Sequence, residues 1–371
     1  MTVGILTFCN TNNYGAELQA YALRKTIEGM GYEVELIDYR CPSVTAGEQP
    51  HLSDPVETFK HPRIALYRLG VYPGLVKRSR AFERFRREHQ RYGPHIIEPR
   101  ELEQRYETVV VGSDQVWNPE ITMDDGMFLL EGLGDKGPRR VAYAASFGFE
   151  SISDAWAERC RRALPAFTAL GVREHEGAKI IESVTGRIAE TVLDPTLLLN
   201  RASWESVAAP PMIERRYVFT YIVQERSSTI RAARAIARYL GIELVAVDCG
   251  GMFWYRGCRT MSHVSPEEFL SLVRHADLVV TSSFHGLALS LSLGTEARFV
   301  LSSYVRNKNS RICSLARTAH VETWEIDHSG DAGDAFRSKH VNFDAIDVAL
   351  SRARQASLSF LEHALQGGRC G

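Results

Sequence analysis

The sequence predicts an α/β protein built from two Rossmann-like halves, each organised around a parallel sheet. A short apolar segment at 3–8 leads through a polar turn into a helical pattern at 16–30 and a second apolar segment at 33–38. The same order of strand, turn, helix and strand returns at 276–301. Short runs rich in β-branched residues suit strands that are buried on both faces of a parallel sheet. Their alternation with helical patterns predicts repeated βα units.

The composition is that of an ordinary globular protein, with 44% hydrophobic and 24% charged residues. The formal net charge of −1 gives no overall positive potential that would attract a nucleic acid, so no nucleic-acid partner is expected. The seven cysteines contain no CxxC pair, so neither a disulfide framework nor a metal site is expected. The sequence shows no signal-peptide pattern and no apolar run of about 18 residues, which predicts a cytoplasmic protein.

A chain of 371 residues is long enough for about two domains. We expect an N-terminal Rossmann-like domain at 1–200, with an insertion or lid at about 41–100, and a second Rossmann-like domain at 201–343. Two adjacent prolines in the segment 201–216 mark it as the linker. The last residues, 344–371, carry a long helical pattern that is expected to pack back across both domains.

The first turn carries polar side chains but lacks a GxGxxG motif, so no dinucleotide cofactor is expected. Asn12, Asn13 and Tyr14 stand where the glycines of that motif would be. Their amide and phenol groups suit a hydroxyl-rich ligand such as a sugar. The alternative for each residue is a turn or cap that begins the following helix.

A basic helix is predicted at 77–91, with Phe82 and Phe85 on one side. Such a helix suits an anionic membrane surface or a lipid-linked phosphate, which would give the protein a peripheral contact with the inner face of the membrane. The commoner explanation is a solvated charged face, and we favour it.

Polar residues follow the predicted strands of the first half. The strand at 107–111 leads into the segment GSDQVWNP, which places Asp114 and Asn118 at a strand's carboxyl end. Arg173 directly follows the strand at 167–172, where a guanidinium can bind phosphate or carboxylate with two donors. An ion pair with a neighbouring glutamate is the competing interpretation. Asp194 follows the last strand of this half.

The second half begins with strand patterns at 217–223 and 242–247, on either side of a helical pattern at 228–240. Ser265 and Glu268 form a capping box that predicts a helix at 266–275. A further helix at 307–318 places Arg311 near its start.

The segment 276–301 carries the strongest candidate site. In open α/β sheets, ligands bind beyond the carboxyl ends of strands, close to helix N-termini. Ser282, Ser283, His285 and Gly286 occupy such a place, where free backbone N–H groups favour an anion. A histidine there can transfer protons near neutral pH. Alternatively, His285 caps the helix or satisfies a buried carbonyl.

The two halves are expected to face each other across a cleft that receives the strand ends of both. Asn12, Asp114 and Arg173 would come from one side, and His285 and Arg311 from the other. This is the GT-B type of arrangement, which suits an anionic donor on one side and an acceptor sugar on the other.

The chain resembles the polysaccharide pyruvyl transferase family over most of its length. The matching segments, in order, are GILTFCNTNNYGAELQAYAL at 4–23, VVVGSDQVWNP at 109–119, AYAASFG at 142–148, VREHEGAKI at 172–180, VLDPTLLL at 192–199 and SPEEFLSLVRHADLVVTSSFHGLALSLSLG at 265–294.

The resemblance implies a GT-B-like fold and transfer of the enolpyruvyl unit of phosphoenolpyruvate to a sugar diol, giving a pyruvate ketal and phosphate. It implies no cofactor beyond this co-substrate, and an acceptor that is a sugar or lipid-linked oligosaccharide. Arg173 matches the arginine of the family's V-R-[DE] motif and is implied to bind the donor. His285 matches the histidine of the last motif and is implied to be the general acid. Asp114 and Asp194 fall on acidic positions of the family.

One departure from the family pattern concerns donor binding. Many members have an arginine two residues before the histidine, and here that position is Ser283. Donor binding then relies on Arg173, Arg311 and the helix N-terminus with Ser282 and Gly286. Two other functions stay open: a GT-B glycosyltransferase that uses a nucleotide sugar, for which Asp248 would hold the ribose, and a non-catalytic sugar- or anion-binding scaffold.

Overall fold

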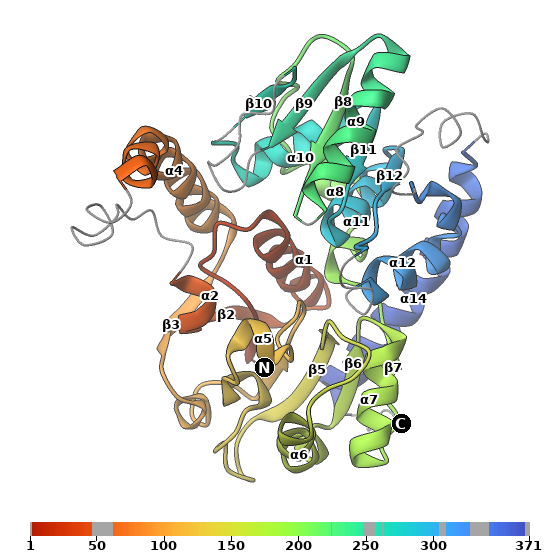
Figure 1. The fold of residues 1–371 in the computed structure, drawn as a ribbon. Helices are drawn as coiled ribbons and strands as arrows, with labels where there is room; N and C mark the ends of the chain where they lie inside the picture. Colours follow the sequence, from red (N-terminus) through yellow and green to blue (C-terminus); the bar gives the residue numbers. More distant parts are fainter. Residues whose placement is uncertain are drawn as a thin grey trace.

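The computed structural model describes residues 2–46, 62–223, 225–247, 257–261, 263–303, 309–326 and 341–367, with the backbone alone at 62–71. Two parallel sheets with helices packed around them form the molecule (Figure 1). This confirms the predicted α/β class with two Rossmann-like halves.

The first sheet has seven parallel strands in the order β3-β2-β1-β4-β5-β6-β7. Its central strand β4 consists of Thr108–Val111, and every one of these residues is buried. Such a strand needs an apolar side chain on both faces, as the sequence predicted. The seven strands are β1 (Thr2–Leu6), β2 (Glu33–Tyr39), β3 (Tyr92–Ile96), β4 (Thr108–Val111), β5 (Arg139–Ala145), β6 (Ala169–Val172) and β7 (Glu190–Thr191).

The helices of this half connect the strands. Helix α1 begins two residues earlier than predicted, because the side chain of Asn13 caps it by accepting from the N–H groups of Gly15 and Ala16. The longer helices here are α1 (Tyr14–Gly29), α4 (Pro62–His89), α6 (Asp154–Ala163) and α7 (His175–Thr185), and the short ones are α2 (Pro42–Thr45) and α5 (Pro119–Thr122).

The predicted insertion at about 41–100 contributes α2, α4 and the edge strand β3 to the first half. Residues 47–61 of this insertion lie outside the described part of the chain. The basic helix predicted at 77–91 is the second half of the longer helix α4. Strand β3 escaped the sequence analysis because only one of its five residues, Ile96, is buried.

The second sheet has five parallel strands in the order β10-β9-β8-β11-β12. The predicted capping box of Ser265 and Glu268 is present at the start of α10. The strands are β8 (Tyr217–Tyr221), β9 (Glu243–Val247), β10 (Arg259–Met261), β11 (Leu278–Thr281) and β12 (Ala297–Phe299), and the helices are α9 (Arg226–Leu240), α10 (Pro266–Arg274), α11 (Phe284–Leu293) and α12 (Ser310–Ala319).

Two segments of this half differ from the prediction. The helix expected at 307–318 is α12 and begins at Ser310, while 304–308 lie outside the described residues. The predicted linker at 201–216 begins with a packed helical turn, α8 (Arg201–Glu205). Its Trp204 is fully buried and donates from Nε1 to the carbonyl of Thr196 at 3.1 Å.

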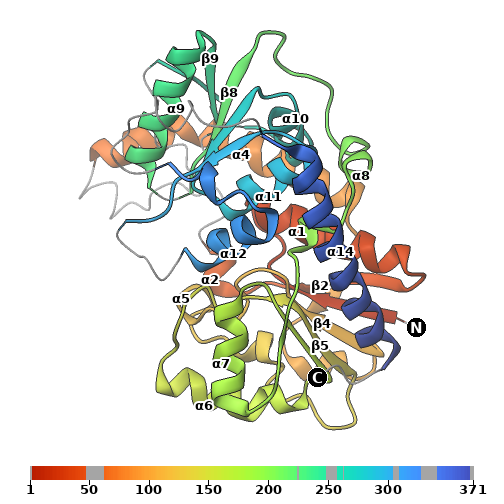
Figure 2. The ribbon, with the colours of Figure 1, turned by 90° about the vertical axis from the view of Figure 1, so that its right-hand side faces the viewer.

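The long helix α14 (Phe343–Gln366) runs beside α12 and continues down onto the first sheet (Figure 2). The carbonyl of Leu365 accepts from Arg139 Nη1 at 2.5 Å, and Ser357 Oγ accepts from the N–H of Leu193 at 2.9 Å. Phe360 fills the space above Gly171, where a Cβ would come within 2.6 Å of its ring. The C-terminal helix therefore contacts both halves.

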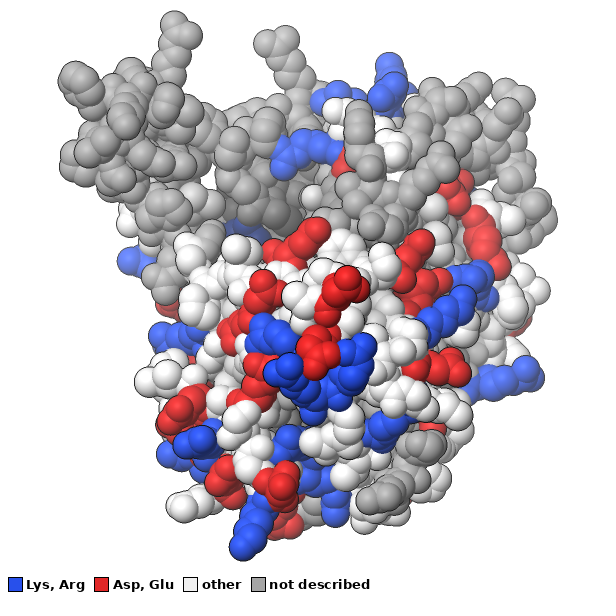
Figure 3. Space-filling model, turned by 60° about the horizontal axis from the view of Figure 1, so that its bottom comes forward, with Lys and Arg blue, Asp and Glu red and all other residues white. Residues whose placement is uncertain are grey.

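Charges of both signs are interspersed on the lower face of the molecule (Figure 3). Here Arg159 pairs with Glu131 at 2.6 Å, and Arg161 and Arg162 both pair with Glu158. None of the described helices is both long and apolar enough to cross a membrane.

Replacing Phe360 with alanine is expected to lower the free energy of unfolding by about 3–5 kcal/mol, because the side chain is only 3% exposed and its loss leaves a cavity above β6. Urea denaturation followed by fluorescence measures this change. Val348→Ala on the same helix is the matched control. Its side chain is 64% exposed, so we expect a change within about 0.5 kcal/mol. Equal effects of both variants would contradict the docking of α14 through Phe360.

Candidate active site

The N-terminus of α11 is fixed tightly to the end of β11. Ser283 caps the helix by accepting from the N–H of Gly286 with its Oγ at 3.3 Å. Thr281 Oγ1 accepts from the N–H of Ser283 at 3.0 Å and donates to the carbonyl of Tyr221 at 2.6 Å. A Cβ at Gly286 would overlap Thr281, so glycine is required for this close approach. The hydroxyl of Ser283 thus has a structural task where many family members are expected to have an arginine.

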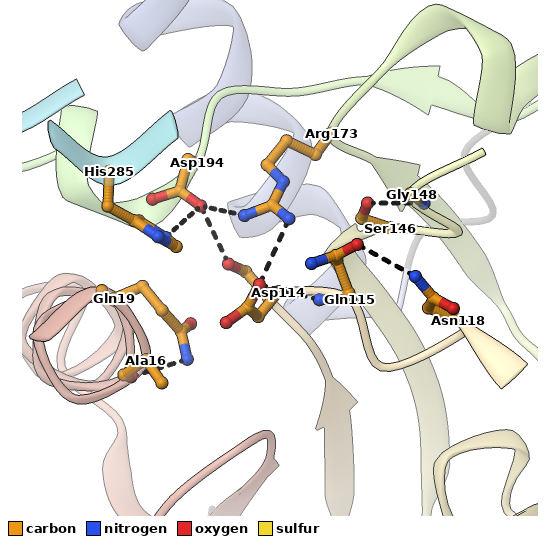
Figure 4. Close-up of polar contacts among 12 residues, drawn as sticks. Ala16, Gln19, Asp114, Gln115, Asn118, Ser146, Gly148, Arg173, Asp194 and His285 are labelled. Carbon is orange, nitrogen blue, oxygen red and sulfur yellow. Dashed lines mark hydrogen bonds and ion pairs between the residues drawn. The ribbon is translucent and has the colours of Figure 1, made fainter. Parts of the chain in front are cut away.

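His285 lies in the first turn of α11 and reaches the other half of the molecule (Figure 4). Its ring packs directly against Gly15 at the start of α1, where a Cβ would overlap Nδ1. The residue is 8% exposed and lines a cavity between the halves. The start of α1 and the start of α11 therefore meet around one imidazole.

Asp194 is the carboxylate closest to this ring. It is 1% exposed, and its Oδ2 lies 3.6 Å from His285 Nε2. The same oxygen accepts from Arg173 Nη1 at 2.9 Å and from Ser113 Oγ at 3.2 Å. Oδ1 accepts from the N–H of Thr196 at 3.0 Å and from its Oγ1 at 2.7 Å. Burial raises the pKa of Asp194, but His285, Arg173 and the Thr196 hydrogen bonds outweigh it and hold that pKa well below its usual range.

Arg173 connects Asp194 with the next carboxylate. Its Nη2 lies 3.3 Å from Oδ1 of Asp114, and its guanidinium carbon lies 4.6 Å from the centre of the Phe284 ring. The arginine side chain is almost completely buried. Figure 4 shows the resulting row of charges from Asp114 through Arg173 and Asp194 to His285. Arg173 thus forms ion pairs with two carboxylates. The sequence analysis considered an ion pair for this residue, but with a neighbouring glutamate as the partner.

Asp114 lines the cavity beside His285. Its backbone has a φ of 75°, in the left-handed region, and its Oδ1 accepts from the N–H of Gln115 at 2.9 Å. The preceding Gly112 has a φ of 112°, and a Cβ there would overlap the carbonyl of Tyr143 on β5. This turn of the GSDQVWNP segment therefore directs a carboxylate into the cavity.

Arg311 enters the cavity from α12. Its buried Nε has no hydrogen-bond partner among the residues that the structure describes. Burial, with the nearby charge of Arg173 as the next cause, lowers the pKa of Arg311 to about 10. The guanidinium therefore stays charged at neutral pH and is available to an anion.

The structure brings six of the predicted site residues to this cavity and leaves six outside it. The cavity is lined by Asn13, Asp114, Ser282, Ser283, His285 and Arg311. Arg173 and Asp194 line a neighbouring cavity that shares Phe284 and Arg311 with the first. Asn12, Tyr14, Asn118 and Gly286 line neither.

Tyr14 and Asn118 have structural partners that leave no contact with the cavity. The hydroxyl of Tyr14 donates to the carbonyl of Val264 at 2.8 Å, and its buried ring stacks on Phe269 of α10 with 4.4 Å between ring centres. Tyr14 therefore joins the two halves in place of the predicted acceptor contact. Asn118 caps α5 by accepting from the N–H of Glu120 at 3.0 Å, and its Nδ2 donates to Gln115 at 3.0 Å.

Two arginines of α4 hold the loop before α1, which the sequence analysis missed. Arg78 Nη2 donates to the carbonyl of Asn12, and the guanidinium lies over the Tyr14 ring at 5.3 Å. Arg86 Nη1 donates to the carbonyl of Thr11 at 2.8 Å and to Oε1 of Glu17 at 3.0 Å. For these two residues the predicted solvated face is wrong. The sequence signal for this inward position was the helical spacing of Arg78 and Arg86 with Phe82 and Phe85, which puts all four side chains on one face of the helix.

Potential metal ligands gather elsewhere. Within the described ranges, Glu88, His89 and Glu267 bring three ligand atoms within 4.8 Å of one another, where α4 meets α10 and outside the cavity of His285. Asp248, the predicted ribose ligand of the glycosyltransferase alternative, lies outside the described residues.

Comparison with known proteins gives a fold and a family. An alpha-glucosyltransferase solved with UDP and a 13-mer DNA matches with a TM-score of 0.50 and 10% identity over 97% of this chain and 95% of that one. The S. aureus MnaA–UDP structure has a TM-score of 0.49 and 9% identity, with 100% and 99% covered. The Methanocaldococcus jannaschii UDP-GlcNAc 2-epimerase has a TM-score of 0.43 and 12% identity, with 91% and 92% covered.

At these identities the likeness shows the fold alone, and it confirms the predicted GT-B type. No curated protein matches the chain in sequence. The family model described as polysaccharide pyruvyl transferase matches residues 13–304, a range that includes His285 and more than half of the chain. The chain therefore belongs to the polysaccharide pyruvyl transferase family.

Proposed function

We propose that this protein transfers the enolpyruvyl unit of phosphoenolpyruvate to two hydroxyls of a sugar in a surface polysaccharide precursor, forming a pyruvate ketal and free phosphate. The observation that carries the proposal is the position of His285. His285 lies in a cavity between the two halves, with an ionised carboxylate 3.6 Å behind it. The same wall carries a guanidinium nitrogen of Arg311 that has no partner among the described residues. Family membership gives the class of reaction.

The donor carries a phosphate and a carboxylate, and both need cationic or N–H partners. Arg311 supplies a fixed positive charge at the cavity wall. The first-turn N–H groups of α11 and its dipole favour an anion at the same place. Arg173 contributes its charge from behind, since its Nη1 and Nη2 groups are engaged by Asp194 and Asp114. Arg311 from α12 thus supplies the cationic contact to the donor that the uncharged Ser283 cannot make.

The proposed reaction begins with transfer of a proton from the His285 imidazolium to C3 of the donor, which makes C2 electrophilic. One sugar hydroxyl adds to C2 and loses its proton, the bond from C2 to the phosphate oxygen breaks, and the second hydroxyl adds to C2. One hydroxyl proton replaces the one given up by His285, and the other leaves with the phosphate. Asp114, which faces the cavity, is placed to orient a hydroxyl and accept its proton.

The acceptor is proposed to be a sugar or lipid-linked oligosaccharide that enters beside Asn13 and Asp114. Incubation with phosphoenolpyruvate and a panel of galactosides and mannosides, with phosphate release and ketal formation as readouts, tests the whole proposal. Turnover that needs a nucleotide sugar instead would reject it in favour of a glycosyltransferase.

His285→Gln is expected to lower kcat by about a hundred- to ten-thousand-fold, because an amide N–H is far too weak an acid to protonate the donor carbon. The KM for phosphoenolpyruvate should change little, since Arg311 and the helix N-terminus remain. Steady-state kinetics measures both constants, and circular dichroism checks the fold. His275→Gln, at the exposed end of α10, is the control and should keep the wild-type rate. If the His285→Gln enzyme kept its activity, His285 could not be the proposed general acid.

Arg311→Gln is expected to raise the KM for phosphoenolpyruvate by about 10- to 100-fold, the size of a lost charge-assisted hydrogen bond. Arg311→Lys should recover part of this loss, because it restores the charge without the planar pair of donors. Arg317→Gln on the exposed side of the same helix is the matched control. If both glutamine variants keep the wild-type KM, the donor binds elsewhere.

Asp194→Asn is expected to lower the free energy of unfolding by about 3–5 kcal/mol, because it leaves the buried Arg173 without one of its two carboxylates. The pKa of Asp194 is held well below its usual range, so the wild-type carboxylate is ionised throughout the neutral range and this pairing is present there. Urea denaturation at pH 7 measures the change. A variant as stable as the wild type would show that the pair contributes nothing to folding.

A further inference from the structure

A second cavity lies on the outside of the five-stranded sheet, along helix α9 and the edge strand β10. Figures 1 and 2 both show α9 at the end of the molecule remote from the seven-stranded sheet. One stripe of α9 forms a wall, the start of β9 forms the floor, and the residues that enter β10 form the opposite wall. Its lining residues include Ile230, Arg231, Arg234, Ala237, Arg238, Leu244 and Arg259.

The charge of this groove is strongly one-sided. Among the described residues that line it, four are arginines and one, Glu243, is acidic. Helix α9 itself has the sequence RSSTIRAARAIARYL, with four arginines and no acidic residue. Arg231, Arg238 and Arg259 are exposed, so their charges face solvent. A protein with a net charge of −1 therefore concentrates positive charge on one face.

The apolar residues of the groove lie beneath the arginines. Ile230, Ala237 and Leu244 are buried, each with an exposed fraction of 8% or less. The surface that the groove offers to a partner is therefore formed by arginine side chains, and their charge suits anionic headgroups.

We propose that this groove docks the protein on a bilayer of anionic phospholipid. The charge complements acidic headgroups along the whole length of α9, and an open groove can receive several of them at once. The basic helix α4, the site suggested by the sequence, is less suited because Arg78 and Arg86 point inward to hold the loop before α1. The lower face is also unsuited, since its arginines are paired with acidic neighbours. Docking is independent of the proposed reaction.

The test is flotation of the full-length protein with vesicles of phosphatidylcholine alone or of equimolar phosphatidylcholine and phosphatidylglycerol. Wild-type protein is expected to float only with the anionic vesicles, and added salt should reverse the binding. Each basic residue near an anionic bilayer contributes about fivefold to the partition coefficient, so Arg231→Gln with Arg238→Gln should weaken binding about 25-fold. Phosphate release with a soluble acceptor should be unchanged in this double variant.

The matched control is Arg161→Gln with Arg162→Gln on α6, which removes the same charge from the lower face and should leave vesicle binding as in the wild type. A second comparison, Arg84→Gln with Arg87→Gln, removes the same charge from the exposed side of α4. The proposal is overturned if wild-type protein does not bind anionic vesicles. It is also overturned if the α4 or α6 pair weakens binding as much as the α9 pair.

Discussion

The buried carboxylate of Asp194 is the interaction on which the site depends. It binds Arg173, lies beside His285, and accepts from Ser113 and from Thr196 in the following turn. An isolated charge in such a place would be costly, and removing one member of a buried charged group usually destabilises a protein strongly. Asp194 is tolerated because the Arg173 guanidinium pairs with it, and Ser113 and Thr196 donate hydrogen bonds to it. The same arrangement places a fixed negative charge 3.6 Å from the His285 ring.

The two halves are joined by contacts that also shape the cavity. Tyr14 donates to Val264 across the interface and stacks on Phe269, while Arg78 lies over its ring and binds the carbonyl of Asn12. The loop before α1 is therefore held by the inserted helix α4 on one side and by α10 on the other. A loop with so many polar backbone groups needs such partners, because unpaired buried groups are expensive. The described part of the insertion thus contributes to the site without supplying a side chain to the cavity.

The sequence predicted the fold class and the position of His285, and the reason lies in local signals. The apolar run at 278–281, the residues SSFHG and the helical leucines together specify a strand, a cap and a helix start. The pairing of Arg173 with Asp114 and Asp194 could not be predicted from the sequence. These residues are far apart in the chain, and only the packing of β4, β6 and β7 brings them together. The role of Gly15 was hidden for the same reason. For Tyr14, chemical type suggested a ligand contact, while burial decided otherwise.

The contact between Gly15 and the imidazole ring links the parts of the active site to the mutual position of the halves. Gly15 and Asp194 belong to segments of the first half, whereas His285 is carried by a helix of the second. Any opening of the two halves would separate the His285 ring from both Gly15 and the Asp194 carboxylate in one movement. In the reaction proposed above, the general acid would then be out of position until the substrates bring the halves together, and the donor would be protected from hydrolysis by water.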